Sequence, residues 1–133
     1  MPSNCILVVD DDLCNLKLVG FTLRREGHKV HTATDGAQAL EIAAREAPDA
    51  VLLDLNMPIL DGAAFVREAR ARGYTFPITV MSAAEEAPAR AREIGAVGCL
   101  AKPFTIGELL TSIDSLLANV EQPRASLAVG TAA

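Results

Sequence analysis

The chain has 133 residues, half of them apolar, and a formal net charge of −5. This length suits one domain around one hydrophobic core, and the apolar content excludes a disordered chain. The acidic balance argues against a nucleic-acid-binding surface, and we find neither a signal peptide nor the roughly 20 apolar residues that span a bilayer.

The first part of the chain alternates strand and helix patterns. Cys5–Val9 is a continuous apolar run, typical of a strand buried on both faces of a parallel sheet. A helical stripe follows, with Asp12 as the predicted N-cap and Gly27 at its C-terminal end; its members are Leu13, Leu16, Val19 and Leu23. Val30–Ala33 is interrupted by polar residues, which suits an edge strand. A stripe of small residues predicts the second helix: Gly36, Ala39, Leu40, Ala43 and Ala47.

The second part repeats this alternation. Further buried strands are predicted at Ala50–Leu53, Ile78–Met81 and Gly98–Ala101. Between them, one stripe predicts a third helix through Gly62, Phe65, Val66 and Ala69, and a fourth helix runs from Ala87 to Ile94 with Pro88 in its first turn. The last stripe has Thr105 as its N-cap and consists of Ile106, Leu109, Leu110, Ile113, Leu116 and Leu117.

Five strands alternating with five helices predict a doubly wound α/β sheet with right-handed crossovers. The periodicity stops after Val120, so we expect one domain over residues 1–120 and a flexible C-terminal tail or linker over residues 121–133. The three cysteines, Cys5, Cys14 and Cys99, lie far apart in apolar segments. This pattern indicates small buried residues of a reducing cytoplasm, not a disulfide or a zinc site.

Polar residues end four of the predicted strands. Asp10 and Asp11 follow the first, Asp54 follows the third, Ser82 the fourth and Lys102 the fifth. The carboxyl ends of parallel strands share one edge of a sheet, which is where open α/β sheets bind ligands. Because carboxylates crowded together repel one another, this edge favours a divalent cation, and Mg²⁺ fits oxygen ligands of this kind.

Asp54 directly follows the central strand and faces two other carboxylates, which favours a nucleophile, although a structural ion pair with Lys102 stays open. A carboxylate that attacks phosphorus forms an acyl phosphate, and this reaction depends on positioning and charge neutralisation. Mg²⁺ and Lys102 would supply positive charge, and Ser82 would donate a hydrogen bond.

Two X-Pro pairs lie near these residues. The Lys102-Pro103 bond has a raised chance of being cis, and Met57-Pro58 opens a predicted turn.

These residues resemble the receiver domain of two-component response regulators from Asn4 to about Asn119. The matching stretches are Ile6 to Asp12, Val51 to Pro58, Asp61-Gly62, Ser82-Ala83 and Lys102 to Phe104. The resemblance implies a flavodoxin-like fold with strand order 2-1-3-4-5. It implies a cytoplasmic signalling switch that accepts a phosphoryl group from a sensor histidine kinase or histidine phosphotransfer protein, and then changes its contacts with a downstream protein target.

The resemblance also assigns the residues of the site. Asp54 is the phosphoacceptor, and Mg²⁺ is held by Asp11, Asp54 and the backbone carbonyl of Asn56, with Asp10 in the acidic pocket or acting through a water. Ser82, the backbone of Ala83 and Lys102 bind the phosphoryl group. The protein would not be an enzyme in the ordinary sense, since it assists only its own phosphorylation and dephosphorylation, and it would contact neither nucleic acid nor membrane.

One position departs from the family pattern. Receivers usually carry an aromatic residue three positions before the lysine, whose ring turns inward as the Ser/Thr hydroxyl moves onto the phosphate. Cys99 occupies that position here. The chemistry at Asp54 is unaffected, but the switch that couples Ser82 to the outer surface is in doubt.

Three other functions share part of this residue pattern. A haloacid dehalogenase-type phosphatase needs an acid two positions after its nucleophile, where this chain has Asn56, and an acidic pair after its lysine, whereas Asp10 and Asp11 come first. A degenerate receiver acting only as a binding module conflicts with the intact set of site residues. A receiver module of a hybrid histidine kinase stays open beside a free-standing regulator.

Overall fold

A computed structural model describes residues 4–57 and 61–120 of the chain. The predicted tail and Pro58 of the predicted turn lie outside these residues. The elements in chain order are β1 Cys5–Val9, α1 Leu13–Arg25, β2 Lys29–Ala33, α2 Gly36–Glu46, β3 Ala50–Asp54, α3 Gly62–Ala71, β4 Ile78–Ala83, α4 Ala87–Ile94, β5 Gly98–Lys102 and α5 Ile106–Leu117.

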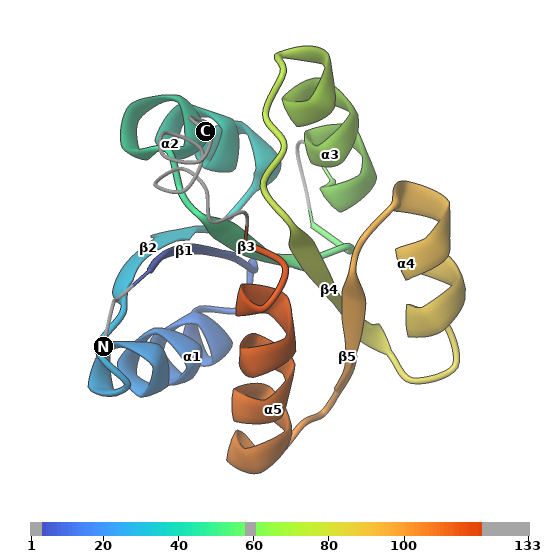
Figure 1. Cartoon of the computed structure of the whole chain (residues 1–133). Coiled ribbons are helices and arrows are strands. Elements are labelled where there is room, and N and C mark those ends of the chain that lie inside the picture. Colours follow the sequence, from blue (N-terminus) through green and yellow to red (C-terminus); the bar gives the residue numbers. More distant parts are fainter. Residues whose placement is uncertain (1–3, 58–60, 121–133) are drawn as a thin grey trace, which may run out of the picture.

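The strands form one parallel sheet in the order β2-β1-β3-β4-β5, which confirms the predicted fold (Figure 1). Alternate residues of each strand point to opposite faces, so Leu7 and Val9 enter one hydrophobic core and Ile6 and Val8 the other. Helices α2, α3 and α4 cover the first core, and α1 and α5 cover the second. Within the described residues, no helix combines the length and apolar character needed to cross a membrane.

The helix ends follow the predicted capping chemistry. The Asp12 carboxylate accepts from the backbone N–H groups of Cys14 and Asn15 at the start of α1. Thr105 and Glu108 form a reciprocal capping box at the start of α5. Pro88 lies in the first turn of α4, and the Lys102-Pro103 peptide bond is cis.

The structure corrects several burial predictions. Leu13 and Ile106 are 59% and 42% exposed, because each is the first residue of its helix and lies beyond the carboxyl edge of the sheet. Ala47 lies outside the apolar stripe of α2, since it is the exposed C-cap in a left-handed conformation. Cys14 and Cys99 are exposed, so the prediction of buried cysteines is wrong for both.

β5 is not buried on both faces as its apolar run predicts. Leu100 is its only fully buried residue, because β5 lies at the edge of the sheet and has a neighbouring strand on one side alone. The strands β3, β4 and β5 also extend further than predicted. Asp54, Ser82 and Lys102 therefore belong to the last one or two residues of their strands, where the ladder holds their backbones.

Candidate functional site

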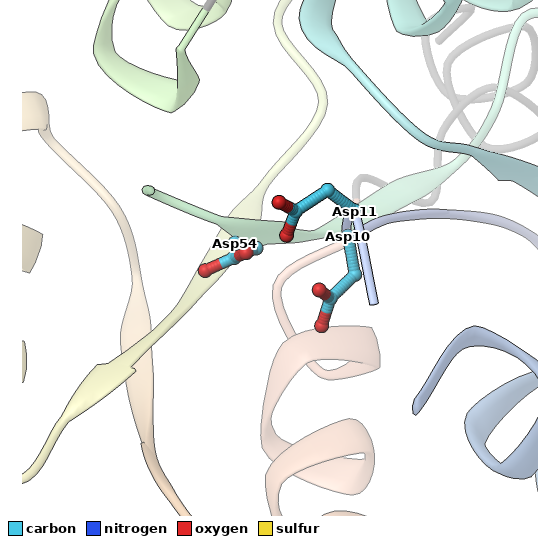
Figure 2. A group of neighbouring side chains, drawn as sticks. All are labelled: Asp10, Asp11 and Asp54. Atoms are coloured by element: carbon cyan, nitrogen blue, oxygen red, sulfur yellow. The ribbon is translucent and has the colours of Figure 1, made fainter. Parts of the chain in front are cut away.

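The carboxyl edge of the sheet brings the predicted site residues together. Asp10 and Asp11 directly follow β1, and Asp54 ends β3. Figure 2 shows their three side chains gathered where these two strands end. One carboxylate oxygen from each lies within 4.8 Å of the other two. Carboxylate oxygens are the ligands that Mg²⁺ takes from proteins, so the chemistry of these three residues fits this ion.

The three carboxylates differ in exposure. Asp10 is completely buried and Asp54 is 3% exposed, whereas Asp11 is open to solvent. Burying two like charges side by side is costly unless a positive charge offsets them. The arrangement therefore favours binding of a cation at the exposed side of the cluster, where Asp11 lies.

Lys102 brings a positive charge to this cluster. Its ammonium lies 3.0 Å from Asp10 Oδ2 and 3.5 Å from Asp54 Oδ1. Burial lowers the pKa of Lys102, but the hydrogen bond and charge of Asp10, followed by those of Asp54, outweigh burial and raise it. Lys102 is thus held in its charged form between two carboxylates.

The surroundings of Asp54 disfavour the ionised form of its carboxyl group. Burial, followed by the negative charge of Asp10, raises the pKa of Asp54 from 3.8 to about 6. The charge of Lys102 and a hydrogen bond from the Asn56 N–H, 3.4 Å from Oδ1, act in the opposite direction without cancelling the rise. At neutral pH Asp54 is mostly ionised, as a nucleophile must be, and a nearby cation would relieve its unfavourable charge.

The turn after β3 depends on Gly62. A Cβ at this position would lie 2.8 Å from the Asp54 carbonyl oxygen and 2.9 Å from the Leu55 Cα. Gly62 therefore lets the start of α3 pack directly on the backbone that carries Asp54. The ligand role of the Asn56 carbonyl in this turn stays a prediction.

Ser82 is 1% exposed near the end of β4, and its hydroxyl donates to Glu86 Oε1 at 3.4 Å. No local sequence pattern indicates this contact, because it depends on how the start of α4 lies against the end of β4. Ala83 follows Ser82 at the end of β4, and its backbone role stays a prediction, as does that of Ser82. Cys99 is exposed on β5, opposite Val80 of β4.

Asn15 is a further residue of this cluster that sequence reasoning missed. Its side-chain amide donates to Asp10 Oδ2 at 2.6 Å. A signal was present, because helical side chains tilt towards the N-terminus of their helix. An amide in the first turn of α1 therefore points back to the carboxylates that precede it.

Comparisons with known proteins identify the family of the chain. A model of the response regulator receiver domain family matches residues 6–114. The transcriptional regulatory protein PrrA of Mycobacterium tuberculosis is 43% identical over 119 residues, which cover 88% of this chain and 51% of PrrA. The chain thus spans about half the length of this curated relative.

Two solved structures are also similar. The chemotaxis response regulator CheY4 of Vibrio cholerae is 32% identical, with a TM-score of 0.79 over 87% of this chain and 100% of that one. The second is the receiver domain of sensor histidine kinase PA1611 from Pseudomonas aeruginosa PAO1, which was solved with a magnesium ion in its active-site cleft. It is 32% identical, and the TM-score is 0.79 over 89% of this chain and 100% of that one. The chain therefore belongs to the response regulator receiver domains, the phosphoacceptor switches of two-component signalling.

Proposed function

We propose that Asp54 accepts a phosphoryl group from the phosphohistidine of a sensor histidine kinase or histidine phosphotransfer protein. The observation that carries this assignment is the position of Asp54 at the end of the central strand, 3.5 Å from Lys102 and among two further carboxylates. Phosphorylation then changes which downstream protein the domain contacts. The haloacid dehalogenase-type alternative is not favoured, since the chain belongs to the receiver family.

In the transfer, an Asp54 carboxylate oxygen attacks phosphorus while the bond from phosphorus to the donor imidazole nitrogen breaks. The electron pair of that bond leaves with the imidazole, and Asp54 becomes an acyl phosphate. Lys102 offsets the charge on the phosphoryl oxygens, and Ser82 and the backbone N–H of Ala83 donate hydrogen bonds to them. The domain acts on no other substrate, and it assists only its own phosphorylation and dephosphorylation.

Asp11, Asp54 and the Asn56 carbonyl would hold Mg²⁺, with Asp10 contributing through a water. The bound ion supplies charge neutralisation between the carboxylates and the incoming phosphoryl oxygens. The oxygen-only donor set and the magnesium ion of the PA1611 receiver support this proposal.

The exposed apolar side of α1 supports docking of the phosphodonor beside the site. Leu13, Leu18 and Phe21 are 59%, 44% and 61% exposed on this one helix, and the Arg25 guanidinium lies 5.8 Å from the centre of the Phe21 ring. Large apolar side chains that gather on an exposed surface are typical of protein interaction sites. The charged residues of α1 are all basic, although the chain as a whole is acidic. We therefore expect a donor surface that is apolar with an acidic margin.

The exposed thiols of Cys14 and Cys99 suit the reducing cytoplasm in which we place this phosphoryl transfer.

A labelling experiment tests the phosphoacceptor. The domain is incubated with acetyl phosphate and Mg²⁺, and the acid-labile adduct is located by mass spectrometry. Wild type and Asp114→Asn, a matched change of an exposed carboxylate on α5, should both carry the adduct, and Asp54→Asn should not. Persistent labelling of Asp54→Asn would overturn the assignment.

A further inference from the structure

The Asp10 carboxylate accepts from three hydrogen-bond donors of the protein, two of them on Oδ2. Its Oδ1 accepts from the Asp12 N–H at 3.0 Å, and its Oδ2 accepts from Asn15 Nδ2 at 2.6 Å and from Lys102 Nζ at 3.0 Å. The bond from Asn15 is the shortest of the three. A buried carboxylate needs such donors, because burial removes the water that would otherwise solvate its charge.

Asn15 is well placed to fix the orientation of Asp10. It lies in the first turn of α1, and its own backbone N–H is bound to the capping carboxylate of Asp12 at 3.3 Å. The amide is therefore anchored to a helix whose start is itself capped. Asp10 is thereby held from one side by a group anchored to α1, while the other donor to Oδ2 is the longer side chain of Lys102, which also lies near Asp54.

Asn15 and Lys102 share the same oxygen atom, which has a consequence for Lys102. Because Asn15 already donates one hydrogen bond to Oδ2, Lys102 can lie between Asp10 and Asp54. Its Nζ is 3.0 Å from Asp10 Oδ2 and 3.5 Å from Asp54 Oδ1. Without the amide, Lys102 would be the remaining donor to this buried oxygen and would be drawn towards Asp10. The Lys102 ammonium would then lie further from Asp54 and would stabilise an incoming phosphoryl group less.

We infer that Asn15 is a positioning residue of the phosphorylation site, which holds the Asp10 carboxylate in place and leaves Lys102 shared between Asp10 and Asp54. This inference rests on the proposed function and deepens it. Groups that hydrogen-bond to metal-ligating side chains typically change metal affinity by about 10- to 100-fold when removed. Asp10 contributes through a water in our proposal, so we expect a smaller loss, about 3- to 10-fold in Mg²⁺ affinity.

The test compares Asn15→Leu with Asn119→Leu. Asn119 follows α5 near the opposite end of the sheet, and its amide also donates a hydrogen bond to a protein group, the Ser115 carbonyl, at 3.0 Å. Mg²⁺ alone is titrated into each protein, and the dissociation constant is read from backbone amide NMR shifts. Asn15→Leu should bind Mg²⁺ about 3- to 10-fold more weakly than wild type, and Asn119→Leu should match wild type. Asn15→Ala replaces Asn15→Leu if the larger side chain disturbs packing.

A second measurement separates positioning from simple destabilisation. At saturating Mg²⁺, Asn15→Leu should still label more slowly with acetyl phosphate than Asn119→Leu of comparable thermal stability, because Lys102 is drawn away from Asp54. Unchanged Mg²⁺ affinity and labelling rate in Asn15→Leu would overturn the role of Asn15. Failure of the wild type to be labelled at Asp54 would instead overturn the proposed function, so the two failures are distinct.

Discussion

The Ser82 hydroxyl donates a hydrogen bond to the Glu86 carboxylate, with 3.4 Å between Oγ and Oε1. Glu86 is the N-cap residue of α4, where its side chain makes no capping bond, and its carboxylate also lies 3.8 Å from Arg90. This contact links the carboxyl edge of the sheet to the first turn of α4. The chain therefore has a direct route from Ser82 to α4, although Cys99 provides no aromatic ring on β5.

The first prediction concerns this route. Beryllofluoride, which mimics the phosphoryl group, should draw Ser82 towards Asp54 and away from Glu86, and shift the backbone amides from Arg90 to Ile94. In Glu86→Ala the Ser82 hydroxyl no longer bonds to residue 86, so its movement cannot break that bond. The amide shifts from Arg90 to Ile94 should therefore be smaller, while those beside Asp54 persist. Glu93→Ala is the control, because Glu93 also lies near Arg90, at 3.6 Å. An undiminished response of α4 in Glu86→Ala would show that the contact carries no signal.

The second prediction concerns Cys99. Because its side chain is exposed, Cys99→Tyr should change the free energy of unfolding by less than about 0.5 kcal/mol. Labelling of Asp54 should continue, and beryllofluoride should cause larger amide shifts around Glu108 to Leu110 than in wild type. If the shifts on α4 and α5 match those of wild type, the missing ring does not limit the response.

The third prediction concerns the metal. Asp11→Ala should weaken Mg²⁺ binding and slow labelling together, because the exposed carboxylate of the cluster is lost. Without metal the same variant should be more stable by about 0.2–1 kcal/mol, the range of charge interactions at exposed sites. NMR titration and urea unfolding in EDTA measure the two effects. Labelling at the wild-type rate in Mg²⁺ would contradict the role of Asp11.

The fourth prediction follows from the raised pKa of Asp54, which is about 6 in the folded protein and about 3.9 when unfolded. The folded state binds the proton more tightly, so this group stabilises the fold below pH 4 and the contribution is lost as the pH rises through 6. In EDTA, Asp54→Asn should therefore exceed wild type in unfolding free energy by about 1–3 kcal/mol at pH 7.5.

This gain should disappear near pH 4, where Asp54 is protonated in the folded state. Urea unfolding at the two pH values measures it, with Asp114→Asn as the exposed control. An equal gain at both pH values would mean that the ionisation of Asp54 does not cause it.

The fifth prediction concerns Gly62. The added Cβ of Gly62→Ala would meet the backbone of Asp54 and Leu55 at 2.8 and 2.9 Å, so α3 must move away from the site. We expect a loss of about 1–3 kcal/mol in unfolding free energy and slower labelling. Gly107→Ala on α5 is the matched control, because its nearest neighbour would be 3.8 Å away. Equal stability of the two variants would contradict the close packing at Gly62.

Local features of this protein were predictable from the sequence, because the interactions that produce them join residues close together in the chain. Asp12 caps α1 through residues two and three positions on, and Thr105 caps α5 through Glu108. The continuous apolar runs at β1 and β3 reflect burial on both faces, which their central places in the sheet impose. The proximity of Asp10, Asp54 and Lys102 was also predictable, because the carboxyl ends of parallel strands lie at the same edge of the sheet.

Only the tertiary structure decided which side chains are covered and which partners they find. Leu13 continues the apolar stripe of α1, yet it is 59% exposed. Gly98–Ala101 is as apolar as a central strand, yet at the edge of the sheet only Leu100 of these four residues is buried. The bonds from Asn15 to Asp10 and from Ser82 to Glu86 depend on how helix ends are placed against strand ends. Hydrophobic periodicity reports which face of an element is buried, but the partner of a polar side chain is set by distances of a few tenths of an ångström in the folded protein.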